Sequence, residues 1–306
     1  MLDLEAYRLS VALDEPFLVP VLVTDDEIPH LVEQLVTELL ADTPSTAFAM
    51  HSMPEERLDE RELLKALLTI RQPEPWLSSG FHIRMDWLLH YERCSRLPLV
   101  TEAMSLPTVQ EMFPATRFPN ATRCSLWRGD IAALRVDAIV NAANAAMLGC
   151  FTPFHSCIDN RIHTVAGPRL REDCQRIMLR QGTPEPTGGA KITRGYHLPA
   201  SFVLHTVGPI YPTDDPQPSH EDQMALATSY RSCLDLAARL PAIRSLAFCC
   251  ISTGVFGFPQ GPAALVALRT INQWLNEHPG RFDRIILNVF DADDLTIYQN
   301  LLNGSR

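Results

Sequence analysis

Short β-rich runs alternate with longer helical runs after residue 116, and this alternation restricts the fold more than any other feature of the sequence. Strands that alternate with helices need crossover connections, which predict a largely parallel sheet covered by helices. The run 245–252 is apolar without alternation, as expected of a central strand that helices cover on both faces. The segment that follows it is therefore expected at a ligand-binding edge of the sheet. The expected strands are 137–141, 190–198, 202–207, 245–252 and 284–290, and the expected helices are 157–180, 222–240, 262–277 and 293–302.

The first part of the chain is predicted to be mostly helical. Apolar residues between 24 and 94 recur at helical spacing, as Leu31, Leu35 and Leu39 do. This periodicity fades between 97 and 120, where prolines accumulate as in a connecting segment. A chain of 306 residues has room for about two domains. We therefore expect a helical N-terminal domain and linker in residues 1–115 and an α/β domain in residues 116–306.

The charge balance argues against a nucleic-acid partner. The chain has 36 acidic residues against 26 basic ones, a formal net charge of -10, and therefore no overall positive field for a polyanion. Its apolar runs fall short of the ~20 residues that span a bilayer, and the first thirty residues lack a basic segment typical of a signal peptide. We expect no membrane partner and a cytoplasmic location. In that compartment eight cysteines indicate buried thiols or a metal site more than a disulfide framework.

The densest group of chemically active residues lies in NAANAAMLGCFTPFHSCIDNRIH at 141–163. It places Cys150, His155 and Cys157 within eight residues, and thiolate with imidazole is a ligand set that Zn²⁺ prefers. Three protein ligands leave one tetrahedral position open, as in a catalytic zinc site, although a fourth ligand can come from elsewhere, with His163 the nearest candidate. The alternative is that both cysteines are small buried residues and the histidine is a hydrogen-bonded loop residue.

A glycine-containing segment, STGVFGFPQGP at 252–262, directly follows the expected central strand and precedes a helix. Glycines let the backbone turn and approach a ligand closely, and free N–H groups at a helix N-terminus favour a phosphate. The segment is therefore interpreted as a phosphate-binding loop, although it matches neither the P-loop nor the Rossmann spacing. The alternative is a tight turn without a ligand.

Two carboxylates near these segments, Asp130 and Asp159, each have two alternative roles. Asp130, in RGDI at 128–131, can accept hydrogen bonds from an exocyclic amine or can cap a turn. Asp159 is the carboxylate nearest in sequence to the Cys/His group, so it can orient a metal ligand or act as a general base. The alternative for Asp159 is the N-cap of the helix that begins there.

Together these segments resemble the zinc-containing macrodomains, hydrolases that remove ADP-ribose from modified proteins. The similarity runs from about residue 126 to the C-terminus, and the string GCFTPFHSCIDN at 149–160 is the most specific part of it. The other matching strings are RGDI at 128–131, NAAN at 141–144, AGPRLREDC at 166–174, PTGGAKITRGYHLP at 186–199, VLHTVGPIY at 203–211 and STGVFGFP at 252–259. One departure is Ala145, where the family often has serine.

The resemblance implies a three-layer α/β/α macrodomain with a mostly parallel central sheet, ADP-ribose in a cleft at one end of it, and a smaller helical domain before it. It implies that Asp130 accepts from the adenine amine beside the backbone of Ile131, that Asn144 binds the distal ribose, and that Phe290 packs on the adenine. The backbone from Ser252 to Phe256 would wrap the diphosphate. The implied ligands of one Zn²⁺ per chain are Cys150, His155 and Cys157; the diphosphate loop comprises Ser252, Thr253, Gly254, Val255 and Phe256; and the implied catalytic group is Asn144, Cys150, His155, Cys157 and Asp159.

The function expected from this resemblance is zinc-dependent removal of mono-ADP-ribose from modified proteins, with an ester linkage to Asp or Glu. The expected partners are ADP-ribose and a mono-ADP-ribosylated protein. Three alternatives stay open at this point. The chain can be a reader that binds ADP-ribose without cleaving it, a hydrolase of small O-acyl-ADP-ribose esters, or a fold in which a closed zinc site is only structural.

Overall fold

A six-stranded sheet forms the centre of the computed structural model, which describes residues 2–19, 23–42, 58–95, 100–211 and 215–304. The strand order is β2-β8-β7-β4-β6-β5, and every neighbouring pair is parallel except β5 and β6. The strands are β2 (Cys124–Arg128), β4 (Ala138–Ala143), β5 (Ala190–Arg194), β6 (Phe202–Val207), β7 (Ser245–Phe248) and β8 (Arg284–Val289), and a separate parallel pair joins β1 (Thr101–Glu102) to β3 (Leu134–Arg135).

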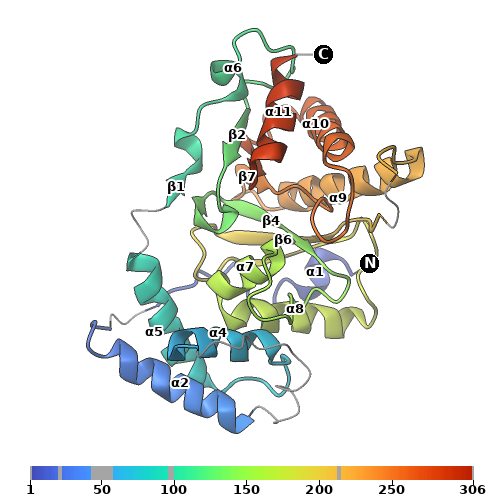
Figure 1. Cartoon of the computed structure of the whole chain (residues 1–306). Helices are drawn as coiled ribbons and strands as arrows, with labels where there is room; N and C mark the ends of the chain where they lie inside the picture. Colours follow the sequence, from blue (N-terminus) through green and yellow to red (C-terminus); the bar gives the residue numbers. More distant parts are fainter. Residues whose placement is uncertain (1, 20–22, 43–57, 96–99, 212–214, 305–306) are drawn as a thin grey trace.

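Helices cover both faces of the sheet (Figure 1), so the predicted three-layer α/β/α fold with a mostly parallel sheet is confirmed. The helices α7 and α8 lie on one side, and α9, α10 and α11 on the other. None of the described helices combines the length and apolar character that crossing a bilayer requires. The helices are α1 (Leu4–Tyr7), α2 (Ile28–Asp42), α4 (Glu60–Ile70), α5 (Ser79–Ser95), α6 (Val109–Met112), α7 (Ile158–Ala166), α8 (Pro168–Gln181), α9 (His220–Ala238), α10 (Gln260–Glu277) and α11 (Ala292–Asn303), with 3-10 turns at Ala103–Ser105 and Ile131–Ala133.

The apolar strand β7 is central, as its sequence predicts. It lies between β8 and β4, and each of its four residues is buried. The single helix expected at 157–180 is instead two helices, α7 and α8, because Gly167 has a φ of +90° between them. A Cβ at Gly167 would lie 2.4 Å from the side chain of Leu89, so glycine there also lets α5 pack closely against this joint.

Helices α2, α4 and α5 form a separate hydrophobic core, which includes Leu35, Leu67 and Phe81. Leu4 and Val109 belong instead to the core that surrounds the sheet. The N-terminal helical region is therefore present, but the first and last parts of 1–115 pack with the α/β domain. The division at residue 115 stays a prediction.

Two largely buried carboxylates, Asp86 and Glu172, join α5 to α8 and to the segment after β5. The carboxylate of Asp86 in α5 accepts from the guanidinium of Arg169 at 2.7 Å and from Nε2 of His197 at 3.1 Å. Nearby, Nε2 of His82 lies 3.0 Å from the carboxylate of Glu172. Hydrogen bonds from His197 and Arg169 keep the Asp86 pKa below its ordinary value, although burial of the carboxylate works in the opposite direction.

We predict that Asp86→Asn destabilises the protein by about 3 kcal/mol, because the amide removes the negative charge and one of the two acceptor oxygens from a buried pair. The depressed pKa means that this loss is full above the ordinary carboxyl pKa of 3.8 and shrinks as the pH falls below it, since protonated aspartate resembles asparagine. Urea unfolding at several pH values measures the difference. Glu102→Gln is the control, because its ion pair with Arg135 is half-exposed and is expected to contribute about 1 kcal/mol or less. Equal losses in both variants would contradict the prediction.

Candidate active site and metal loop

A cleft of about 850 Å³ lies at the carboxyl ends of the parallel strands. Parallel strands bring the segments that follow them to one edge of a sheet, and the segments after β2, β4, β7 and β8 all line this cleft. The cleft brings together every residue predicted for the site: Asp130, Ile131, Asn144, Cys150, His155, Cys157, Asp159, Ser252, Thr253, Gly254, Val255, Phe256 and Phe290. Their individual roles stay predictions.

The glycine-containing loop turns sharply after β7. Ser252 is buried with a φ of +67°, and its carbonyl accepts from the N–H of Phe258 at 2.9 Å. Within the described part of the chain, no hydrogen bond uses the N–H groups of Gly254, Val255 and Phe256. Those three N–H groups are therefore available to an anion in the cleft, as a phosphate-binding loop requires.

The side chain of Asp130 caps a turn and also lines the cleft, while its contact with an exocyclic amine stays a prediction. Its side chain caps the turn Ile131–Ala133 by accepting from the N–H of Ala132 at 2.9 Å. Its second oxygen accepts from Arg161 of α7 at 2.7 Å, and this pair is part of the cleft wall. At the same end of the cleft the ring of Phe290 is 73% exposed, directly after β8. A carboxylate and an exposed ring together suit a planar base that carries an amine.

Asn144 shapes the turn that leads into the Cys/His segment. Its Oδ1 accepts from the N–H groups of Ala146 and Met147, and its Nδ2 donates to the carbonyl of Gly149 at 3.1 Å. Ala145 is exposed and does not line the cleft, so the missing serine hydroxyl bears on this turn more than on a ligand. Asn144 therefore holds the backbone immediately before Cys150.

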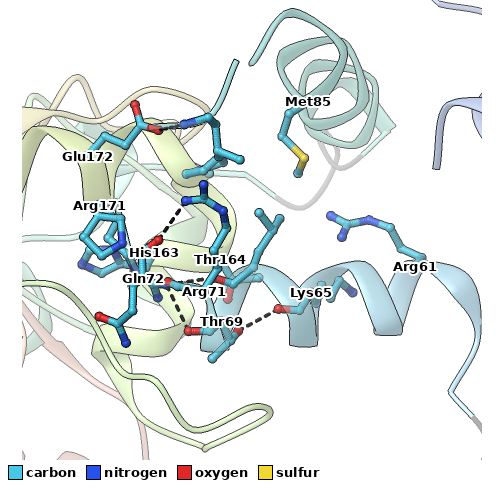
Figure 2. A pocket seen from close by; sticks show the side chains of 15 residues that line it. Arg61, Lys65, Thr69, Arg71, Gln72, Met85, His163, Thr164, Arg171 and Glu172 are labelled. Atoms are coloured by element: carbon cyan, nitrogen blue, oxygen red, sulfur yellow. Dashed lines mark hydrogen bonds between the residues drawn. The ribbon is translucent and has the colours of Figure 1, made fainter. Parts of the chain in front are cut away.

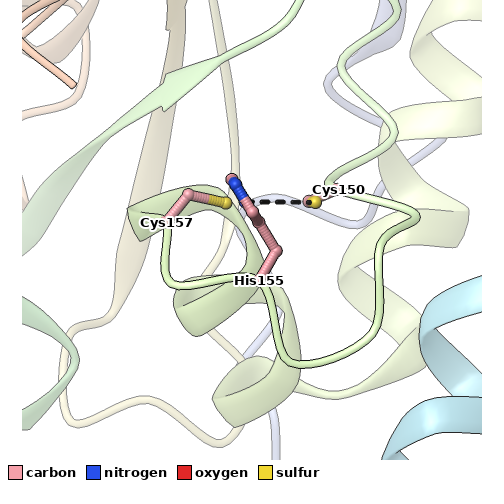
Figure 3. Close-up of side chains that lie close together, drawn as sticks. All are labelled: Cys150, His155 and Cys157. Atoms are coloured by element: carbon pink, nitrogen blue, oxygen red, sulfur yellow. Dashed lines mark hydrogen bonds between the residues drawn. The ribbon is translucent and has the colours of Figure 1, made fainter. Parts of the chain in front are cut away.

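The metal loop, residues 149–157, brings three potential ligands together (Figure 3). The donor atoms of Cys150, His155 and Cys157 all lie within 4.8 Å of one another, and Sγ of Cys150 is 3.7 Å from Nδ1 of His155. Sγ of Cys150 also accepts from the N–H of Thr152 at 3.4 Å, and Sγ of Cys157 from that of Asn160 at 3.4 Å. Burial raises the pKa of the Cys157 thiol to about 12, so its thiolate needs a neighbouring cation. This donor set can bind a metal ion.

A second group, missed by the sequence analysis, consists of the buried side chains of His163, Cys174 and His205. His163, considered above as a fourth ligand for the metal loop, is grouped with Cys174 and His205, and its buried ring lies against Gly149. This group can also bind a metal ion. His205, however, already accepts from Nδ2 of Asn141 at 3.2 Å and lies 3.0 Å from the hydroxyl of Thr193.

Asp159 lies between the two groups. The N-cap of α7 is Cys157, not Asp159, so the capping interpretation of Asp159 is wrong. The Asp159 carboxylate is buried, accepts from Nδ2 of Asn141 at 2.8 Å and lies 3.4 Å from Nε2 of His163. Burial raises its pKa to about 6, which is close to the range that suits general acid–base work at neutral pH.

Helix α4 also forms part of the cleft, which the sequence analysis did not predict. Arg61, Lys65 and Thr69 recur at four-residue spacing, on one face of the helix, and line the cleft near the metal loop. The same three residues border a smaller cavity of about 40 Å³ that reaches His163 and Arg171 (Figure 2). The N-terminal helices therefore help to enclose the metal end of the cleft.

Several known proteins are similar to this chain in both sequence and fold. The Macro domain family matches residues 140–267. A protein-ADP-ribose hydrolase of Treponema medium is 40% identical over 269 residues, which are 88% of this chain and 97% of that protein. A protein-ADP-ribose hydrolase of Staphylococcus aureus strain MRSA252 is 48% identical over 178 residues, which are 58% of this chain and 65% of that protein. A solved structure of the Trypanosoma brucei macrodomain in complex with ADP-ribose has 32% identity and a TM-score of 0.56, covering 77% of this chain and 94% of that one. The chain therefore belongs to the macrodomain family, together with proteins named protein-ADP-ribose hydrolase.

Proposed function

We propose that this protein hydrolyses the bond between ADP-ribose and a modified protein, with Zn²⁺ in its metal loop and an ester to Asp or Glu as its substrate. The observation that carries the proposal is that the glycine-containing loop and the metal loop line one cleft of about 850 Å³. An anion-binding backbone and a metal-binding group in the same cleft suit a diphosphate that carries a ribose. Relatives named protein-ADP-ribose hydrolase support this activity.

In the proposed complex the adenine lies at the end of the cleft where Asp130 and Phe290 meet. The diphosphate receives hydrogen bonds from the free N–H groups of the loop at 252–256, which adds no buried side-chain charge. The distal ribose then lies near Asn144 and the metal loop. This order places the ester that links ribose and protein at the metal end.

The metal loop fits Zn²⁺ by its chemistry, since two sulfurs and one imidazole nitrogen are the ligands that this ion prefers. Cys150, His155 and Cys157 would hold one ion per chain. When bound, it would supply positive charge and Lewis acidity beside the distal ribose.

Two side chains of the protein, Asn144 and Asp159, have further roles in the proposed reaction. Asn144 fixes the backbone before Cys150 through its bond to Gly149, and so keeps the metal loop against the ribose end of the cleft. Burial raises the pKa of Asp159 to about 6, which is within about one unit of neutral pH. Asp159 can therefore hold or release a proton close to the proposed scissile bond.

We predict that Cys157→Ala lowers release of ADP-ribose from a protein modified on Asp or Glu by at least about 100-fold, the scale expected when an electrostatic contact to developing charge is lost. Release is followed by chromatography, and zinc content by mass spectrometry. Cys94→Ala is the control, because Cys94 is an exposed thiol of α5 outside the cleft. The wild type and the control should hold about one zinc per chain.

Three results would overturn parts of this proposal. Tight binding of ADP-ribose without release by the wild type would indicate a reader. Full turnover by zinc-free, folded Cys157→Ala would remove zinc from the reaction. Unfolding on chelation, in step with the loss of activity, would favour a structural zinc.

We predict that Asp130→Asn weakens ADP-ribose binding about 10-fold or more, because hydrogen bonds to a charged group contribute about 1.5–3 kcal/mol. Calorimetry with ADP-ribose and with its hypoxanthine analogue, which lacks the amine, tests the contact directly. The wild type should prefer adenine, and Asp130→Asn should lose most of this preference. Arg161→Gln is the matched control, since it breaks only the ion pair of Asp130. An unchanged preference in Asp130→Asn would contradict the adenine assignment.

A further inference from the structure

Arg171 joins the N-terminal helices to the metal loop through a single buried side chain. Arg171 belongs to α8, and only 8% of the residue is exposed. Its guanidinium donates to both neighbouring segments. The contacts are Nη1 to the carbonyls of Leu68 at 2.8 Å, Thr69 at 3.0 Å and Arg71 at 3.0 Å, and Nη2 to the carbonyl of Cys150 at 3.3 Å, with the ring of Phe151 4.7 Å away.

The three carbonyls on the helical side belong to the C-terminal end of α4. The last carbonyls of a helix have no partners within it and carry a partial negative charge, which a cation stabilises. A guanidinium can satisfy several of them at once because its five N–H donors diverge in a plane, whereas a lysine ammonium cannot bridge two segments in this way. Arg171 therefore ends α4 and reaches the metal loop with the same group.

At the metal loop, Arg171 donates to the backbone carbonyl of Cys150, which is one of the proposed zinc ligands. Most of the metal loop between Cys150 and Cys157 is exposed, so packing alone does little to fix its shape. Its position depends on polar anchors instead. Asn144 binds the carbonyl of Gly149, Arg171 binds that of Cys150, and Asn160 binds those of Thr152 and His155. Of these three anchors, Arg171 also contacts the N-terminal helices.

We propose that Arg171 is a positioning residue that sets the metal loop in its ligand geometry by tying it to the end of α4. The N-terminal helices are then part of the metal site, and their docking and metal binding stabilise each other. This inference rests on the proposed binding of Zn²⁺ by Cys150, His155 and Cys157. It requires no contact between Arg171 and the substrate.

The chain offers a close control two residues earlier on the same helix. Arg169 also joins α8 to the N-terminal helices, through its ion pair with Asp86 in α5. Its hydrogen bonds reach Asp86 and not the metal loop. Arg169→Lys and Arg171→Lys therefore make the same chemical change in the same interface, and they differ in whether the metal loop loses an anchor.

The first experiment compares Zn²⁺ affinity by competition with a chromogenic chelator. For Arg171→Lys we expect binding about 10–100-fold weaker than in the wild type, the range typical for loss of an outer-sphere partner. For Arg169→Lys we expect a change of less than about 3-fold. Affinity for ADP, which lacks the distal ribose, should be unchanged in both variants, and kcat should fall in Arg171→Lys with little change in KM. Equal losses of zinc affinity in the two variants, or none in Arg171→Lys, would overturn the proposal.

The second experiment uses the wild-type chain, so it does not depend on how a variant folds. Amide hydrogen exchange is measured with and without Zn²⁺. Because coupling between two sites is reciprocal, zinc should slow exchange at residues 66–71 as well as in the metal loop. Slowing confined to the loop would overturn the proposal, and failure of the wild type to bind zinc would overturn it together with the metal site. A protein that shows the coupling but never releases ADP-ribose would refute the hydrolase and leave the role of Arg171 intact.

Discussion

Parallel pairing of β2, β8, β7 and β4 is the constraint on which the site depends. Each parallel connection must cross over through a helix, so the segments that leave these strands all emerge at one edge of the sheet. Residues separated by more than 150 positions, such as Asp130 and Phe290, therefore meet in one cleft. The same constraint makes β7 buried on both faces, which is why its run is apolar without alternation. Because the glycine-containing loop follows β7, the position of this strand places the loop at the edge of the sheet that lines the cleft.

Beneath the metal loop the fold buries polar side chains that an apolar core would exclude. Asn141 extends from a central strand and donates to both Asp159 and His205, so one amide satisfies two buried groups. Burying polar groups is tolerated only when they are paired. The same burial raises the Asp159 pKa to about 6 and lowers that of His205 to about 3, which keeps the latter neutral. The site therefore combines a buried polar floor with an exposed loop.

The sequence predicted most of the fold and the cleft because their signals are local. Alternating strand and helix runs, the string with Cys150, His155 and Cys157, and the loop after β7 each lie within one short segment. Most of what it did not predict depends on contacts between distant segments. Cys174 and His205 are 31 positions apart and meet only through the packing of α8 on the sheet. The break between α7 and α8 has a local signal that the sequence analysis missed, because Gly167 takes a positive φ and Pro168 begins α8. Only the approach of Leu89 from α5 depends on a distant contact.

The contacts of Arg171 are another example of this limit. Its partners on α4 are backbone carbonyls, which every residue type supplies, so the helix needs only the right length and position. What this contact requires of the sequence is the arginine in α8 and the apolar core of α2, α4 and α5, which places α4 beside it. The N-terminal helices contribute the side chains of Arg61, Lys65 and Thr69 to the cleft as well as these carbonyls, and only a three-dimensional structure reveals either contribution.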